Sequence, residues 1–107
     1  MAKMPSFFEE FRSIYPQVAE HYRQLGDACR AAGPLDTRTA ELVKLGMSIA
    51  AGAEGGTHAH ARRAREAGVT RDELWHVALL AITTLGFQRA MTGLAWIRDV
   101  TDATAKG

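Results

Sequence analysis

The chain has 107 residues, enough for one domain but too few for two. Hydrophobic residues make up 47% of it and charged residues 23%, a composition typical of a folded globular protein and not of a disordered one. The formal net charge of +1 provides no overall field that would attract nucleic acid or an anionic membrane, so neither is expected as a partner.

The cysteine content and the apolar stretches indicate the compartment. Cys29 is the only cysteine, so an internal disulfide is excluded and a reducing, cytoplasmic location is expected. The start, "MAKMPSFFEEF", has an acidic pair where a signal peptide would need an apolar run. The longest apolar stretch, "LWHVALLAITTLGF", is shorter than the roughly 20 residues that a membrane-spanning helix needs.

The first third of the chain predicts two helices. Ser6 followed by Glu9 three residues later is a capping-box pattern at the start of the first helix. Pro16 fits the first turn of the second helix, which should run to about Ala32. The Gly-Pro step that follows should end this helix, because glycine favours a helix C-terminus and proline cannot continue the helix.

The rest of the chain predicts four more helices and no strand. Asp36 is a candidate cap for the third helix, and Thr70 with Glu73 forms a second capping-box pattern at the start of the fifth. The four helices are expected at about residues 37–52, 57–67, 71–85 and 88–100. The sequence therefore predicts an all-α bundle of about six helices in a single domain, residues 1–107, with a polar tail that frays.

The fifth expected helix, in "LWHVALLAITTL", has almost no polar face. A helix that is apolar all round must be covered all round, and a domain this small has little mass with which to enclose it. We expect that another subunit covers the remaining face, which makes the protein a homo-oligomer. The alternative is that shorter helices of the same chain wrap around the fifth helix.

Two histidines one residue apart, in "EGGTHAHARR", raise the question of a site. On a regular helix they lie about 200° apart, so His58 and His60 should face nearly opposite ways. His60 shares its face with two alanines, which is the packable side, and His58 shares its face with two arginines, which is the solvated side. The two rings are therefore not a chelating pair on a regular helix.

His60 and Glu41 are the candidate catalytic residues. The N-terminal dipole of its helix should lower the pKa of His60 and keep a neutral imidazole that acts as a base, although a core histidine satisfied by one hydrogen bond is the alternative. Glu41 lies beside an apolar stripe, where a carboxylate is partly desolvated and requires a partner. The alternative for Glu41 is a boundary residue that pairs with Lys44 or Arg38.

Other polar residues carry weaker signals. A metal site made of Glu41, His58 and His60 is a third hypothesis, which requires His58 to lie in the loop before the helix. Glu54, in the glycine-rich turn, could contribute to a pocket. His76, in the apolar fifth helix, is interpreted as a packing residue, and the sequence predicts no cofactor.

Two segments, "LDTRTAELVKLGMSIAAG" and "HARRAREAGVTRDELWHVALLAITTLGF", resemble the carboxymuconolactone decarboxylase and alkylhydroperoxidase D family over roughly residues 35–97. The resemblance implies an alkylhydroperoxidase D-like helical bundle that forms oligomers, commonly trimers or hexamers. In the peroxidase branch a C-x-x-C pair precedes a histidine, and a glutamate lies about a dozen residues upstream of the first cysteine. Glu41 and His60 match that glutamate and that histidine.

The two cysteine positions of the peroxidase branch fall on Ala53 and Gly56. Because peroxide reduction of this type needs an attacking thiolate and a second thiol that resolves the sulfenic acid, the resemblance does not extend to a dithiol peroxidase. The decarboxylase branch also lacks the cysteines, which favours lyase- or isomerase-like proton transfer by Glu41 and His60 on a small organic acid or lactone. The competing hypothesis is a non-enzymatic oligomeric module in which the pair is purely structural.

Overall fold

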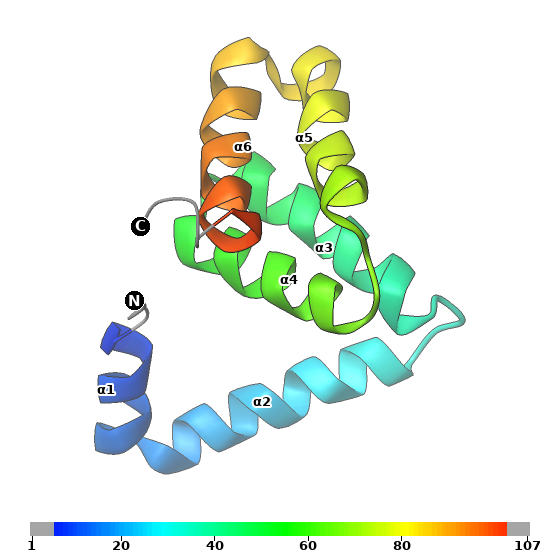
Figure 1. The fold of residues 1–107 in the computed structure, drawn as a ribbon. Helices are drawn as coiled ribbons and strands as arrows, with labels where there is room; N and C mark the ends of the chain where they lie inside the picture. Colours follow the sequence, from blue (N-terminus) through cyan, green and yellow to red (C-terminus); the bar gives the residue numbers. More distant parts are fainter. Residues whose placement is uncertain (1–5, 103–107) are drawn as a thin grey trace. The chain divides into compact units, whose positions relative to one another are not determined.

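The computed structural model describes residues 6–102, which are all-α and contain no strand (Figure 1). The six helices are α1 (Ser6–Ile14), α2 (Pro16–Ala31), α3 (Thr37–Ala51), α4 (Glu54–Glu66), α5 (Arg71–Leu85) and α6 (Phe87–Thr101). The predicted fold class and the predicted number of helices are therefore confirmed. The contacts between residues divide the chain into two compact units, Met1–Leu35 and Asp36–Gly107.

The first unit contains α1 and α2. Pro16 occupies the first turn of α2, as expected, and the helix ends one residue earlier than the sequence predicted. The ring of Phe11 lies 6.3 Å from the ring of Phe8 and 5.6 Å from the ring of Tyr15, centroid to centroid, so aromatic contacts join the last turns of α1 to the start of α2. The predicted Ser6 cap lies outside the residues whose side chains the structure describes, and so do residues 103–107 of the predicted polar tail. The first residue of that tail, Thr101, is the last residue of α6.

The second unit contains α3 to α6. In Figure 1, α5 and α6 run antiparallel side by side and pack against the pair formed by α3 and α4. Its core is a single cluster of buried apolar side chains to which all four helices contribute. The members are Leu45, Ile49, Ala61, Ala64, Val69, Leu74, Ala78 and Ile97.

The ends of α3 and α5 follow their sequence signals. The Asp36 side chain accepts a hydrogen bond from the Thr39 amide at 2.8 Å, which caps α3. Thr70 and Glu73 form the full reciprocal capping box at the start of α5. Gly52 ends α3 with a φ of 71°, a left-handed conformation that glycine adopts without steric cost.

The start of α4 differs from the prediction, because the helix begins at Glu54 and not at Thr57. The amide of Thr57 donates to the Ala53 carbonyl at 2.9 Å, so the first turn already includes Gly55 and Gly56. A Cβ atom at position 56 would lie 3.0 Å from Ser48 Oγ. Glycine is therefore used here for the close packing of α4 on α3, and not to break the helix.

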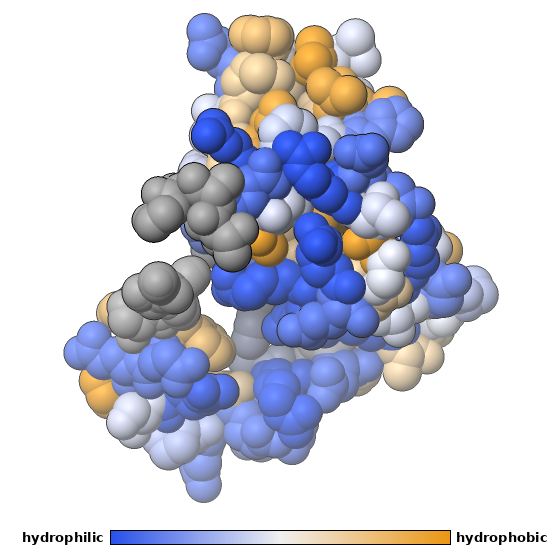
Figure 2. Space-filling model, viewed as in Figure 1, coloured by the Kyte–Doolittle hydropathy of each residue, from blue (hydrophilic) through white to orange (hydrophobic). Residues whose placement is uncertain are grey.

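Helix α5 buries one face and exposes apolar side chains on another. Leu74, Ala78 and Ala81 are buried, whereas Leu79 and Leu80 are 51% and 59% exposed. Figure 2 shows hydrophobic residues gathered around the end of α5 and the start of α6, where Phe87 is also exposed. Within the described residues, no helix is both long enough and apolar enough to span a membrane.

Candidate functional site

Glu41 and His60 meet between two adjacent helices. The packing of α3 on α4 places Nδ1 of His60 2.8 Å from Oε1 of Glu41. Glu41 is a charged residue in the core, with its side chain only 2% exposed, while the His60 side chain is 13% exposed. The structure thus brings together the two residues that the sequence proposed as a pair.

The surroundings of His60 lower its pKa below the ordinary value. Burial of the ring is the largest cause, since a charged imidazolium loses hydration there. The hydrogen bond and the charge of Glu41 oppose this effect and raise the pKa, while Lys44 and Arg63 lower it further. The direction agrees with the prediction, but the main cause is desolvation and not the helix dipole.

The pairing decides which nitrogen of His60 is available for chemistry. Glu41 acts to raise the pKa of His60, which is the effect of a carboxylate that accepts a hydrogen bond from Nδ1–H. The carboxylate fixes the orientation of the ring and stabilises it when Nε2 takes up a proton. The ring is 13% exposed and Glu41 is almost completely buried, so the imidazole is the part of the pair that solvent reaches.

His58 does not lie on the solvated side as the sequence predicted. Its Nε2 lies 3.0 Å from Oδ2 of Asp99, and its side chain is 13% exposed. Helix α6 packs against α4 and covers this face near the start of α4, which the rotation argument alone could not show. The proposed set of Glu41, His58 and His60 is not brought together: His60 faces Glu41, while His58 faces Asp99 and Glu54.

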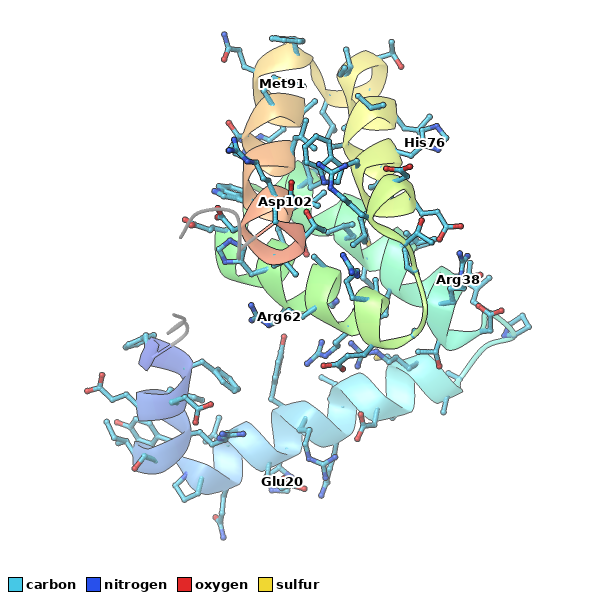
Figure 3. All side chains as sticks on the ribbon, in the orientation of Figure 1. Glu20, Arg38, Arg62, His76, Met91 and Asp102 are labelled. Atoms are coloured by element: carbon cyan, nitrogen blue, oxygen red, sulfur yellow. The ribbon has the colours of Figure 1, made fainter. Side chains whose placement is uncertain are left out.

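Two other polar residues also differ from their predicted surroundings. Arg38, an alternative partner of Glu41, instead forms an ion pair with Glu73 and so joins the start of α3 to the start of α5. His76 was interpreted as a packing residue but is exposed, and Figure 3 shows it projecting outward from α5. Asp99 was not identified from the sequence, because 41 residues separate it from His58 and no local pattern connects them.

The two positions that the resemblance assigns to cysteines lie at the start of α4. Ala53 is the N-cap residue of this helix and Gly56 is in its first turn, one turn before His60. Cys29, the only cysteine of the chain, is exposed in the other compact unit. The Glu41–His60 pair therefore stands at this helix without the thiols that a dithiol peroxidase would require.

These features define a class of protein: an all-helical chain with a buried carboxylate–imidazole pair shared by two packed helices. The family model of the carboxymuconolactone decarboxylase family matches residues 16–99, so the chain belongs to this family. The match extends beyond the segments at 35–97 that resembled it and includes α2. Comparisons with curated proteins and with solved structures found no match.

Proposed function

We propose that this protein catalyses proton transfer on a small organic acid or lactone in the cytoplasm, with decarboxylation as the reaction that fits best. The observation that supports this function is the 2.8 Å contact between His60 and the buried Glu41. His60 is the acid–base group that meets the substrate. Glu41 is a positioning residue that acts through the ring and does not itself reach solvent.

The proposed step needs no redox group. The bond between the carboxylate carbon and the lactone breaks, CO₂ leaves, and the electron pair stays on the lactone carbon, where conjugation with the carbonyl spreads the charge. That carbon then takes a proton from Nε2 of the protonated His60, and the ring recovers a proton from water. Burial lowers the pKa of His60, which makes the imidazolium a stronger acid, while the charge of Glu41 opposes this effect and stabilises the protonated ring that the step uses.

The test is an assay of decarboxylation in D₂O. Carboxymuconolactone and simpler unsaturated lactone acids are incubated with the full chain, and ¹H NMR follows the conversion of the substrate to the decarboxylated lactone and the replacement of a product proton by deuterium. We expect turnover by the wild type and a loss of about 100-fold or more in His60→Gln, since general acid–base catalysis contributes at least this much. His76→Gln, a change of an exposed histidine on α5, should match the wild type.

Two results would overturn the proposal. One is the absence of turnover and of deuterium incorporation with every member of the panel. The other is a folded His60→Gln variant that keeps the wild-type rate, because the ring would then carry no proton in the reaction.

We also propose that the family domain assembles as a homo-oligomer through the apolar surface of its second unit. The surface includes exposed side chains on α3, α5 and α6, namely Val43, Met47, Leu79, Leu80, Leu85 and Phe87. Patches of this kind on a globular protein mark interaction surfaces. A second copy is the occupant we favour, because a chain with a formal charge of +1 meets little electrostatic repulsion from its own copies.

Leu80→Glu is expected to shift the protein toward monomer, because a carboxylate in an apolar interface must be desolvated without a partner. Light scattering after size-exclusion chromatography measures the mass. The control is Gln17→Glu, which adds the same charge at an exposed polar position on α2, outside this surface. A wild type that runs as a monomer would refute the assembly. It would favour the alternative that helices of the same chain cover the apolar residues of α5.

A further inference from the structure

We propose that Glu54, His58 and Asp99 form a binding site for a divalent first-row transition-metal ion, with Zn²⁺ as the representative. Each of the three side chains offers one ligand atom, and these three atoms all lie within 4.8 Å of one another. In the described part of the chain, this is the one group of three histidine, cysteine or acidic residues placed closely enough to hold a metal ion. None of these residues belongs to the Glu41–His60 pair. The site is therefore independent of the proposed proton transfer.

The helical register explains how the three side chains converge. Glu54 and His58 are four residues apart on α4, so they project from the same face of the helix, one turn apart. Two donors at this spacing can share one ion, which is the geometric basis of helical H-x-x-x-H metal sites. Asp99, on α6, supplies the third donor because α6 packs against α4.

The separation of the donor atoms fits a small ion. Imidazole nitrogen and carboxylate oxygen bind Zn²⁺ at about 2.0–2.2 Å, so two ligands of one ion lie about 3.0–3.5 Å apart. The Nε2 atom of His58 and Oδ2 of Asp99 are 3.0 Å apart. Glu54 is exposed at the first residue of α4, so rotation of its side chain can bring its oxygen to the same ion.

The donor set selects the class of ion. An imidazole nitrogen is a ligand for zinc, iron, nickel and copper, whereas calcium and magnesium prefer sites made only of oxygen. Two carboxylates beside a neutral imidazole give a charge of −2, which a divalent cation neutralises. Arg62, one turn after His58 on α4, is the neighbouring cation on this helix and would limit the affinity.

The site has an open side. Glu54 is exposed at the first residue of α4, so solvent reaches the site from this side and water can complete the coordination of an ion. The His58 side chain, by contrast, is largely buried and held by Asp99. Three protein ligands with an accessible fourth position are the arrangement of a zinc site that exchanges ligands, and not of a closed structural site.

The test is equilibrium binding of Zn²⁺ to the full chain by isothermal titration calorimetry, with Co²⁺ absorption as a second probe of the ligands. We expect one equivalent per chain for the wild type, and a loss of affinity of at least tenfold in both Asp99→Asn and Glu54→Gln. The control is His76→Gln, which removes a histidine from exposed α5 and should bind like the wild type. Because Glu54 is exposed, its variant stays informative even if Asp99→Asn loosens the contact between α4 and α6.

Three outcomes would overturn the proposal. The wild type could bind no stoichiometric Zn²⁺ or Co²⁺. Glu54→Gln and Asp99→Asn could both bind as the wild type does, which would place the ion elsewhere. His76→Gln could lose binding to the same extent as the site variants, which would indicate adventitious binding to histidine. None of these results bears on the decarboxylation assay, because that reaction uses His60 and Glu41.

Discussion

Glu41→Ala is expected to lower the free energy of unfolding by about 2–4 kcal/mol. The Glu41 side chain is 2% exposed and bonded to Nδ1 of His60, so its removal leaves a cavity and a ring nitrogen without this partner. The cavity and the unsatisfied nitrogen each cost stability, and the total is large beside the 5–15 kcal/mol by which typical domains are stable. Urea unfolding followed by circular dichroism measures the change.

Glu41→Gln is the matched variant that separates structure from catalysis. Glutamine has nearly the same shape, and its carbonyl oxygen can still accept from Nδ1–H, so the loss of stability should be less than half of that in Glu41→Ala. The negative charge that stabilises protonated His60 is removed, however, so the decarboxylation rate should fall at least tenfold. A Glu41→Gln variant with full activity would reduce Glu41 to a packing residue.

The same pair of variants distinguishes the enzyme from the purely structural module. If the pair only holds α3 against α4, Glu41→Ala should unfold or dissociate the protein, and no variant should affect any reaction. If the pair transfers protons, Glu41→Gln should remain folded and assembled while its activity falls. A Glu41→Ala variant as stable as the wild type would contradict both interpretations, because the buried carboxylate would then stabilise nothing.

Gly93→Ala is expected to destabilise the protein by about 1–3 kcal/mol, the range for overpacking a filled core. Gly93 is buried in α6, and a Cβ atom there would lie 2.6 Å from Cγ2 and 2.9 Å from Cγ1 of Ile49. Ile49 is fully buried on α3, and its branched Cβ allows little change of rotamer. Either α6 must move away from α3 or the side chain must leave its preferred conformation.

Gly46→Ala is the control for this prediction. Gly46 is also inside a helix, but its added Cβ would meet Val77 at 3.9 Å, an ordinary van der Waals contact. Alanine at an uncrowded helical position should raise stability by about 0.5–1 kcal/mol, because the unfolded chain has less freedom to lose. Urea denaturation of both variants should therefore give changes of opposite sign, and equal changes would show that the approach of α6 to α3 is not tight.

The local signals of the sequence predicted most of the secondary structure. Asp36, and the pair of Thr70 and Glu73, cap the helices that they were expected to cap, because a cap depends on residues three positions apart. The start of α4 was predicted wrongly, since glycines were taken as a helix break. At Gly56 the close approach of Ser48 on α3 outweighs the low helix propensity of glycine, and that contact is not local.

The candidate site was predicted only in part. Glu41 and His60 were paired through their resemblance to a family pattern, together with the apolar surroundings of Glu41. For His58 the rotation around α4 predicted solvent, and the structure instead places Asp99 beside it. That partner comes from α6, and the sequence contains no periodicity that relates two helices to each other.

The sequence alone was sufficient to predict the all-α class, most helix ends and the absence of a thiol pair. Each of these features depends on composition or on neighbours within one helical turn. Tertiary packing alone decided that His58 meets Asp99, that Arg38 pairs with Glu73, and that Gly93 lies against Ile49. The physical reason is that a helix specifies which side chains share a face, but the helix that packs on that face, and its register, depend on how the whole core is filled.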